Sequence, residues 1–360
     1  MHLRNTVAND RGAPCDRRRC TMQELVFVER GKLEWRERDA PRVEGAGEAL
    51  VRPLVVTRCD LDRAIVTGVF PMAGPFAVGH ETVGEVLEVG SGVTRVRPGD
   101  RVVVPFQISC GACDRCARGF TGSCREVPLR SSFGLGPLSG REWGGALSDV
   151  IRVPYADAML VALPEGLDPM IAAGAADNVS DGWRTVAEPL AQLPGAPVLV
   201  VGGAAESIGL YAVASARALG ASEVAYVDHD EARLAIASAL GARVVPFARD
   251  AKPGRFAITV DASARTEGLR LALACTDVEG TCTSVGVYTT EVSLPLLELY
   301  SKGVRFLTGR AHARAVLPEV LAKLADRTLA IDAVTMARVM WGDARDAWGE
   351  PATKMVVARE

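Results

Sequence analysis

The sequence has no long apolar run and no excess of either charge. No uninterrupted stretch of about 18 apolar residues occurs, which argues against a membrane-spanning helix. Lys and Arg number 41 against 44 Asp and Glu, and the formal net charge is -3. The chain therefore shows neither the basic face of a nucleic-acid-binding protein nor an acidic tail. We expect its partner to be a small molecule, and neither nucleic acid nor a membrane.

A secretory signal and a disulfide framework are also missing. Residues 1–21 are polar and contain a run of arginines with no apolar segment behind it, so we expect a flexible extension, or a start codon placed too early, with the fold beginning at Met22. Four cysteines either lie in that extension or resemble buried small residues: Cys15, Cys20, Cys275 and Cys282. We therefore expect a cytoplasmic protein.

What the sequence does contain is a cluster of four cysteines with the spacing C-x2-C-x2-C-x7-C. The cluster consists of Cys110, Cys113, Cys116 and Cys124. Thiolates spaced in this way on a glycine-containing loop can converge on one tetrahedral zinc ion, and four sulfur ligands leave no position for a substrate. The alternative is a redox or disulfide cluster, but nothing else indicates an oxidising compartment. We predict a structural zinc site.

The chain changes character near its middle. From Glu24 to about Pro154, short β-type runs are broken by glycine and proline, which predicts a compact β-barrel-like lobe. From Ile171 onward, Ala-rich helical stretches alternate with apolar strands, which predicts a parallel sheet. The tail from about Leu317 has one more helix and ends in the strand-like segment KMVVA. A chain of 360 residues is long enough for two domains.

The segment from Val198 to Asp228 has the order strand, glycine-rich turn, helix, strand and acid, which is the first half of a dinucleotide-binding unit. Its glycines are Gly202, Gly203 and Gly209. They let the backbone approach a pyrophosphate at the helix N-terminus, where unpaired N–H groups favour negative charge. Asp228 can accept hydrogen bonds from the adenosine ribose and would repel a 2′-phosphate, so it favours NAD over NADP. Arg233 is close enough in sequence to reach the same ribose.

A second set of candidate metal ligands precedes the cysteine cluster. Cys59 is followed by Asp62, and then by His80 and Glu81 in the fragment GHETVGEVLEVG. Asp177 lies where the β lobe gives way to the α/β lobe, and a cleft is expected there. Taken singly, a lone Cys is more often buried filler and a lone Asp a helix cap. In combination, Cys59, His80 and Asp177 would hold zinc with one open position for substrate.

Taken together, these residues resemble the zinc-containing medium-chain dehydrogenase/reductase family, which includes alcohol, polyol, glucose and formaldehyde dehydrogenases. The shared motifs are GHE at 79–81, PGDRV at 98–102, GGALSDVIRVP at 144–154, Cys59 with Asp62 and Gly68, the four cysteines and the nucleotide segment. Asp177 falls where relatives carry Cys, Glu or Asp, as in the formaldehyde dehydrogenase branch, whereas CDLDRAIVTG is closer to the glucose dehydrogenases. The subfamily is open.

The resemblance implies a GroES-like β-barrel catalytic domain with an inserted Rossmann doubly wound sheet, and a homodimer or homotetramer. It places the catalytic domain at 22–178, the NAD-binding domain at 179–312 and a returning segment at 313–360. It implies two zinc ions per chain, with Cys59, His80 and Asp177 at the catalytic zinc and Asp62 and Glu81 beside it. The cofactor site then also takes in Ala205, Ser207, Ile208, Val285 and Arg310.

The expected reaction is hydride transfer between an alcohol or polyol and its aldehyde or ketone, with zinc as Lewis acid and NAD as acceptor. Relatives place Ser or Thr two residues after the first cysteine ligand to pass the alcohol proton to solvent. This chain has Leu61 there, and Ala64 where some relatives carry a relay histidine. The candidate substitutes are Asp181, Ser180 and His312.

Further expectations concern the acids and the pocket wall. Asp60 and Glu206 would stand beside a diphosphate and weaken its binding unless they point away or pair with arginine, for which Arg310 and Arg314 are candidates. A surface carboxylate facing water is the simplest account of Glu206. Four residues are expected at the substrate pocket, the first two as its wall and the others at its mouth: Leu61, Phe106, Phe133 and Trp143. Such an apolar pocket suits a simple or aromatic alcohol better than a sugar.

Two alternatives to the alcohol dehydrogenase remain open. Leu61 is compatible with an NAD(P)H-dependent reductase of an activated enone or iminium group, in which the proton relay has changed. Asp60 and Glu206 are compatible with a non-catalytic relative that binds nucleotide or zinc.

Overall fold

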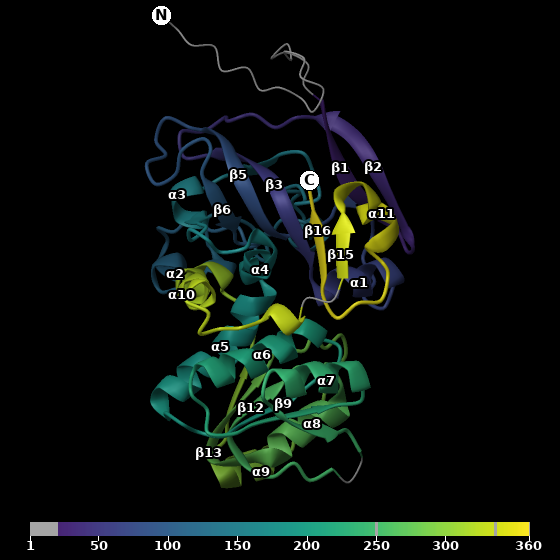
Figure 1. Ribbon diagram of the computed structural model, residues 1–360, viewed down its shortest axis with the longest axis vertical. Coiled ribbons are helices and arrows are strands. Elements are labelled where there is room, and N and C mark those ends of the chain that lie inside the picture. The colour runs from purple at the N-terminus through teal and green to yellow at the C-terminus, as the bar shows by residue number, and fades with distance from the viewer. Residues whose placement is uncertain (1–20, 249–250, 335–336, 360) are drawn as a thin grey trace, which may run out of the picture.

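The computed structural model describes residues 21–248, 251–334 and 337–359, which form two lobes stacked along the long axis (Figure 1). The expected N-terminal extension, with Cys15 and Cys20, lies outside these ranges except for Thr21, which is the first residue of β1. Within the described ranges, no helix has both the length and the apolar character needed to cross a membrane.

The first lobe is built on two largely antiparallel sheets. One sheet has the order β15-β16-β3-β5-β6-β8, with β7 also paired to β3, and the other has the order β2-β1-β4. Their strands are β1 (Thr21–Glu29), β2 (Lys32–Asp39), β3 (Ala49–Arg58), β4 (Phe76–Ala77), β5 (Glu81–Val89), β6 (Arg101–Val104), β7 (Ile151–Val153), β8 (Val161–Ala162), β15 (Ala337–Met340) and β16 (Met355–Ala358). The β-branched residues of β3 and β5 favour strands and fill the core of the lobe.

The second lobe is a six-stranded parallel sheet in the order β11-β10-β9-β12-β13-β14. Its strands are β9 (Val198–Val201), β10 (Val224–Asp228), β11 (Arg243–Pro246), β12 (Phe256–Asp261), β13 (Thr276–Ser284) and β14 (Arg305–Thr308). All four residues of β9 are buried, as expected for a central parallel strand covered on both faces. Starting from the first strand, the order reverses at β9, which is the switch point where doubly wound sheets bind ligands.

Helices cover this sheet and connect the lobes. They are α5 (Asn178–Gln192), α6 (Glu206–Ala218), α7 (Glu231–Ala239), α8 (Thr266–Cys275), α9 (Leu296–Lys302) and α10 (Ala313–Ala325). The first lobe contributes α1 (Asp60–Thr67) and the short helices α2 (Asp114–Ala117), α3 (Ala156–Met159), α4 (Pro169–Ala172) and α11 (Ala344–Ala347). The short 3-10 helix Ala173–Ala176 and α5 carry the chain from one lobe into the other.

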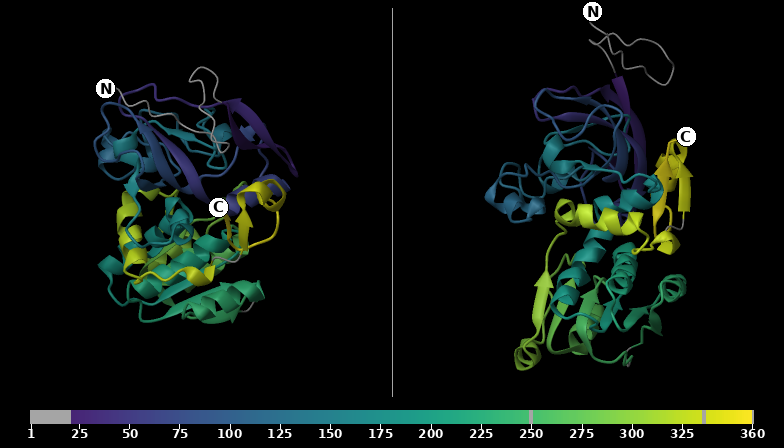
Figure 2. Two further views of the ribbon diagram at one scale, coloured as in Figure 1. Left: turned by 45° about the horizontal axis from the view of Figure 1, so that its top comes forward. Right: turned by 60° about the vertical axis from the view of Figure 1, so that its left-hand side comes forward.

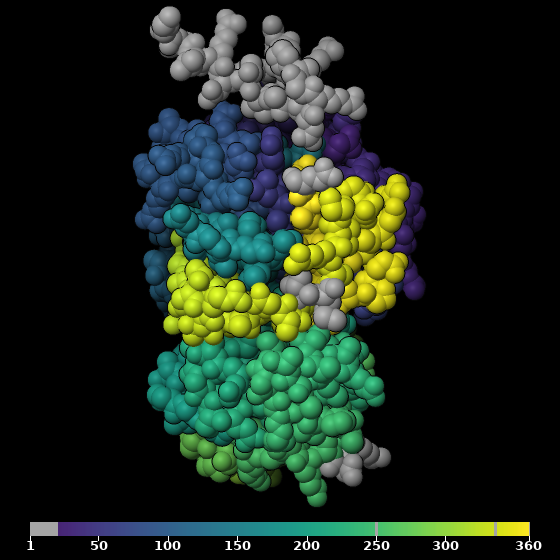
Figure 3. All heavy atoms as spheres, in the orientation of Figure 1, coloured from purple at the N-terminus to yellow at the C-terminus, as the bar shows by residue number. Residues whose placement is uncertain are grey.

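The chain then returns to the first lobe. Helix α10 lies at the boundary between the lobes (Figures 2 and 3). Strands β15 and β16 join the sheet of the first lobe (Figure 2). Strand β16 runs antiparallel to β3, with Met355 opposite Arg58 and Ala358 opposite Val55. The predicted fold class, a β-barrel-like lobe with an inserted doubly wound parallel sheet, is confirmed.

Candidate functional site

Cys59 and His80 come together because two neighbouring strands pair. Cys59 follows β3 and His80 precedes β5, and these antiparallel strands place Thr57 opposite Glu81. The end of β3 therefore lies beside the start of β5. Both Cys59 and His80 are buried. Cys59 is also the N-cap of α1, and its backbone N–H donates to Oδ2 of Asp62 at 3.1 Å.

Asp177 reaches the same point from the crossing between the lobes. It is the N-cap of α5, and its Oδ2 lies 3.3 Å from Nε2 of His80. The ligand atoms of Cys59, His80, Glu81 and Asp177 all lie within 4.8 Å of one another, and all four residues are buried. A thiol, an imidazole and a carboxylate at this spacing are a suitable donor set for zinc.

The buried carboxylates of this group favour the binding of a cation. Neither ring nitrogen of His80 has a hydrogen-bond partner among the described residues, although both are buried. Burial lowers the pKa of His80, but the carboxylates of Asp62 and Asp177 outweigh it and raise the pKa to about 9. Burial, followed by the Asp177 and Glu81 carboxylates, raises the pKa of Cys59 well above its ordinary value. A bound metal ion would give the imidazole a partner, balance the carboxylates and favour the thiolate, so these residues fit zinc.

Asp62 and Glu81 have different partners. Oδ1 of Asp62 lies 3.5 Å from Nδ1 of His80, on the side of the ring away from Asp177, where it orients the imidazole. Glu81 instead accepts hydrogen bonds from the hydroxyl of Thr57 and from Nζ of Lys354, the latter at 2.7 Å. Burial raises the pKa of Glu81 to about 7, against the opposing effect of Lys354.

Lys354 is a residue that sequence reasoning missed. Its side chain is 1% exposed, and β16 brings it to Glu81 from the far end of the chain. Burial alone would lower the pKa of Lys354, but the Glu81 carboxylate reverses this and the pKa lies above its ordinary value. The available signal is a lysine placed directly before the buried strand Met355–Ala358, where a solvated side chain is unusual.

The four-cysteine cluster lies in the loop that follows β6. Its four sulfur atoms also lie within 4.8 Å of one another. Backbone N–H groups point at the sulfurs, with Cys113 N 3.3 Å from Sγ of Cys110 and Arg125 N 3.5 Å from Sγ of Cys113. The Arg125 amide is the main cause that lowers the pKa of Cys113 to about 6. Four converging sulfurs, one of them readily ionised, fit a closed zinc site.

The nucleotide segment folds as strand β9, a tight turn and helix α6. A Cβ on Gly202 would lie 2.2 Å from the hydroxyl oxygen of Tyr226, so only glycine fits there. Asp228, at the end of β10, forms a two-pronged ion pair with Arg233, whose Nε and Nη2 each lie 2.8 Å from a carboxylate oxygen. Burial raises the pKa of Asp228, but Arg233 outweighs it, and the pKa lies below its ordinary value. Whether these residues contact a ribose stays a prediction.

Asp60 lies beside the start of the helix that follows the glycine-rich turn, as the sequence suggested, and Glu206 pairs with arginines, although not with the two that were proposed. Asp60, the first residue of α1, accepts hydrogen bonds from the backbone N–H of Ser207 at 3.0 Å and from its hydroxyl at 3.1 Å. Burial raises the pKa of Asp60, against Lys354 and the bonds from Ser207. Glu206 lies 3.8 Å from Arg63 and 3.7 Å from Arg233.

Arg310 and Arg314, which were proposed as partners of these acids, have other contacts. The guanidinium of Arg314 donates to the carbonyl of Ala158, and Arg310 lines the cavity on the side of Asp177. The actual partners of Glu206 lie on α1 and α7. Only the packed fold brings those three elements together.

The candidate metal ligands and the nucleotide turn open into one cavity of about 460 Å³ between the lobes. The predicted residues on its wall are Cys59, Leu61, His80, Phe106, Asp177, Ala205, Ile208, Val285 and Arg310. Several apolar residues of the wall were not predicted, among them Val69, Phe70, Leu135, Leu138 and Val287. Val69 and Phe70 follow α1 directly, so their place near Cys59 is the signal that was overlooked.

Of the three candidate proton carriers, only Asp181 lines this cavity. Its carboxylate is paired with Nε of Arg184 at 2.5 Å. The hydroxyl of Ser180 donates to the carbonyl of Ala175 and is buried in the helix packing. Nδ1 of His312 accepts a hydrogen bond from the backbone of Gly122, so this histidine packs beneath the four-cysteine loop.

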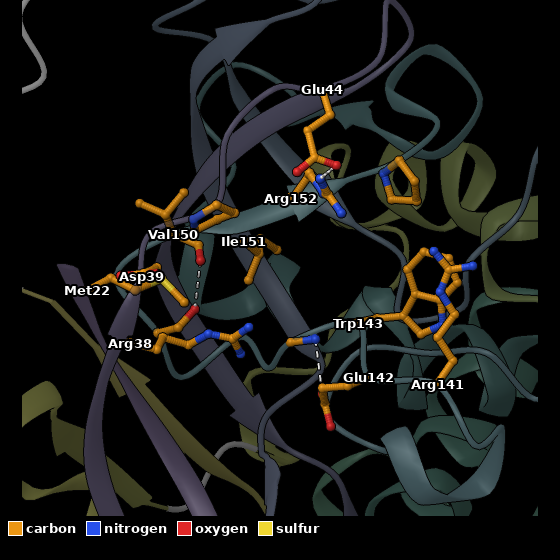
Figure 4. Close-up of a pocket in the computed structure, with 14 residues that line it drawn as sticks. Met22, Arg38, Asp39, Glu44, Arg141, Glu142, Trp143, Val150, Ile151 and Arg152 are labelled. Atoms are coloured by element: carbon orange, nitrogen blue, oxygen red, sulfur yellow. Dashed lines mark hydrogen bonds and ion pairs between the residues drawn. The ribbon is translucent and has the colours of Figure 1, made fainter. Parts of the chain in front are cut away.

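Phe133 and Trp143 do not close the mouth of the cavity. Phe133 is buried in the core of the first lobe, because β-sheet residues surround it. The guanidinium carbon of Arg141 lies 4.0 Å from the centroid of the Trp143 ring. Both residues line a separate pocket of about 270 Å³ (Figure 4). Met22 and Arg38 of the first two strands also line that pocket. None of the candidate metal ligands does.

Comparison with known proteins agrees with this architecture. Residues 45–165 match the alcohol dehydrogenase GroES-like domain, and residues 207–326 match the zinc-binding dehydrogenase domain. An alcohol dehydrogenase of Cupriavidus necator is 32% identical over 293 residues, which are 76% of this chain and 79% of that protein. A glutathione-independent formaldehyde dehydrogenase of Pseudomonas aeruginosa is 32% identical over 236 residues, 63% of this chain and 59% of that protein. The structure of alcohol dehydrogenase TADH from Thermus sp. ATN1 superposes with a TM-score of 0.86 at 29% identity, covering 94% of this chain and 100% of that one.

Proposed function

This chain belongs to the zinc-containing medium-chain dehydrogenase/reductase family and is an alcohol dehydrogenase-like oxidoreductase, and we propose that it interconverts an alcohol or polyol and its aldehyde or ketone with NAD(H). The observation that carries the proposal is one shared cavity. Cys59, His80 and Asp177 open into it from one side, and Ala205, Ile208 and Val285 of the nucleotide half line the other.

The chemistry divides between the bound groups and the chain. Zinc held by Cys59, His80 and Asp177 would supply a Lewis acid for the substrate oxygen, and the nicotinamide would take up or deliver the hydride. The chain supplies position and exclusion of water. Asp62 fixes the imidazole of His80, and the apolar side chains of Leu61 and Phe106 keep water from the reacting carbon.

The proton of the alcohol needs an acceptor, because neither Leu61 nor Ala64 can carry a proton. We assign this task to Asp181, whose carboxylate lies on the cavity wall beside Arg184. Replacement by Asn removes the acceptor and retains the size. We expect kcat of Asp181→Asn to fall while the dissociation constant of NADH stays unchanged. A fall in kcat together with a rise in the dissociation constant of NADH would instead indicate a role in the fold of the cavity.

We propose two zinc ions per chain, one for each group of ligands. One would be bound by Cys110, Cys113, Cys116 and Cys124, and the other by Cys59, His80 and Asp177, with Glu81 in reach. The reduced thiols that both sites need support a cytoplasmic location. Metal analysis of the purified protein measures the ratio directly.

The preference for NAD over NADP rests on the charges around Arg233. This one guanidinium faces three carboxylates, those of Asp228 at 2.8 Å, Asp230 at 3.6 Å and Glu206 at 3.7 Å. The local balance is therefore negative where a 2′-phosphate would add two further negative charges. We expect kcat/KM to be higher with NAD, and equal values for NADP would contradict the preference.

The substrate class follows from the cavity wall. Leu61, Val69, Phe70, Phe106 and Leu138 offer no hydrogen bond to a sugar hydroxyl, so simple and aromatic alcohols should be better substrates than polyols. A panel of alcohols, polyols and hydrated aldehydes, followed by NADH absorbance, tests this. Faster turnover of sorbitol than of benzyl alcohol would contradict it.

A second candidate reaction keeps the same site. Since Leu61 stands where a hydroxyl would pass a proton, reduction of an activated enone or iminium group is the alternative. Offering NADH with benzaldehyde and with a conjugated enone separates the two, because only the reductase would turn over the enone faster. The non-catalytic alternative is not retained, since the family is one of enzymes.

The oligomer that we propose is a homodimer formed at the β14 edge of the parallel sheet. Several large apolar side chains are exposed near this edge, among them Leu297 (80%) and Tyr300 (85%) of α9, Leu307 of β14 and Val278 of β13. A second copy would cover both these side chains and the unpaired strand. Light scattering should show a dimer that Leu297→Glu dissociates, whereas a monomeric wild type would contradict the assignment.

A further inference from the structure

The N-terminus of helix α6 already has an anion on it. Asp60 Oδ2 accepts the backbone N–H of Ser207 at 3.0 Å, and Oδ1 accepts its hydroxyl at 3.1 Å. Asp60 belongs to α1 in the first lobe and Ser207 to α6 in the second. The contact therefore crosses the cleft between the lobes and occupies the donors of the helix that follows the glycine-rich turn.

Those donors are the ones that a dinucleotide needs. In a strand–turn–helix unit of this kind the diphosphate lies at the helix N-terminus and accepts hydrogen bonds from its free N–H groups. A carboxylate on the same N–H group competes with a phosphate oxygen for position and repels its charge. Asp60 and a bound diphosphate cannot both lie at Ser207.

The guanidinium of Arg63 lies about one helical turn from Asp60 on α1. Arg63, three residues after Asp60 on α1, faces Glu206 at 3.8 Å, and its Nε is buried with no hydrogen-bond partner among the described residues. Glu206 is the first residue of α6, so Arg63 lies at the same helix end as Asp60. The guanidinium is weakly held at this distance and free to turn toward an anion.

We propose that Asp60 is an internal substitute for the diphosphate of the cofactor, that the dinucleotide binds by displacing it from Ser207, and that Arg63 then takes the diphosphate. This inference rests on the proposed use of NAD(H). In the absence of cofactor, the bond between Asp60 and Ser207 ties the two lobes together. The binding energy of the dinucleotide is reduced by the loss of that bond, so affinity for diphosphate ligands is set by residue 60.

The test compares wild type with Asp60→Asn, which keeps the shape and removes the charge. Adenosine, ADP-ribose and NADH are titrated by calorimetry, with Asp168→Asn as the matched control. Asp168 also caps a helix, accepting the N–H of Met170 at 2.9 Å, but lies at α4 and not at the nucleotide turn. Zinc content is measured for each variant to show that the neighbouring Cys59 still binds metal.

The proposal predicts that Asp60→Asn binds ADP-ribose and NADH about tenfold tighter, since an anion leaves the helix end, and that adenosine binding is unchanged. Asp168→Asn should match wild type for all three ligands. Unchanged or weaker ADP-ribose binding by Asp60→Asn would overturn the proposal, and Asp60→Ser provides the same comparison if the Asn variant does not fold. If wild type and variants alike fail to bind ADP-ribose and NADH, the proposed cofactor itself is wrong.

The role of Arg63 has its own variant. Arg63→Gln removes the charge and retains a polar side chain on α1. We expect it to weaken ADP-ribose binding several-fold and to leave adenosine binding unchanged, with the effect persisting in the Asp60→Asn background. Equal ADP-ribose affinity with and without Arg63 would remove this arginine from the site.

Discussion

The two groups of metal-ligating residues differ in how they are assembled. The four cysteines come from one loop, and backbone N–H groups are their neighbours; Cys110 and Cys113 are partly exposed, whereas Cys116 and Cys124 are buried. Cys59 follows the end of β3, His80 precedes the start of β5, and Asp177 caps α5. All three are buried among carboxylates. A local loop makes a closed site that stabilises a lobe, whereas a site assembled from distant elements can border a cavity. Substitutions at the two sites should therefore affect different properties of the protein.

The largest effect is expected on the site that borders the cavity. Cys59→Ser should lower kcat/KM by at least about a thousandfold, because metal-ion catalysis contributes several kcal/mol to the transition state. Its unfolding temperature should stay close to that of wild type, and Cys275→Ala, a buried cysteine in the second lobe, should remain active. Steady-state kinetics and circular dichroism measure the two properties, and full activity of Cys59→Ser would exclude this metal site.

The closed site should show the opposite pattern. Cys116→Ser should reduce zinc from two ions to one per chain and lower the free energy of unfolding by several kcal/mol, since structural zinc contributes to folding directly. The activity of the fraction that remains folded should be retained. Unfolding in guanidinium, combined with metal analysis, tests this. Equal stability of Cys116→Ser and wild type would mean that the loop holds itself together without metal.

A third effect concerns the buried pair beneath the open site. Lys354→Met leaves Glu81 buried without its cation and should destabilise the protein by about 3–5 kcal/mol. The double variant Lys354→Met with Glu81→Gln should recover part of this loss, because no unpaired charge remains. Urea denaturation measures both, and additive losses in the double variant would show that the two side chains are not coupled.

The smallest of these effects belongs to Asp62. Asp62→Asn keeps the backbone contact with Cys59 but weakens the orientation of the His80 ring, and should lower activity or zinc affinity by about 10–100-fold. Glu165→Gln, at a distant loop, is the control. A wild-type zinc affinity and a wild-type rate together would assign Asp62 to helix capping alone.

The sequence revealed those features whose signal is local. The four cysteines, the glycine turn before α6 and the alternation of strands and helices each lie within a short stretch, and the fold class predicted from them is confirmed. The edge strand Lys32–Asp39 was not singled out, because six of its eight residues are charged and its apolar alternation is limited to Leu33 and Trp35.

Contacts between distant elements were beyond sequence reasoning. Arg63 and Arg233 are the partners of Glu206 only because α1, α6 and α7 converge, and Lys354 meets Glu81 only because β16 pairs with β3. Trp143 was expected at the mouth of the substrate pocket. It contacts Arg141 in another pocket, since an aromatic side chain carries no information on which face of a barrel it will lie.

The pairing of β16 with β3 has a consequence for synthesis. The ribosome releases Cys59, His80 and Asp177 well before Lys354, so a nascent chain holds these groups beside a Glu81 that has no counter-charge. Assembly of the metal-binding side of the cavity thus waits for the last strand to dock.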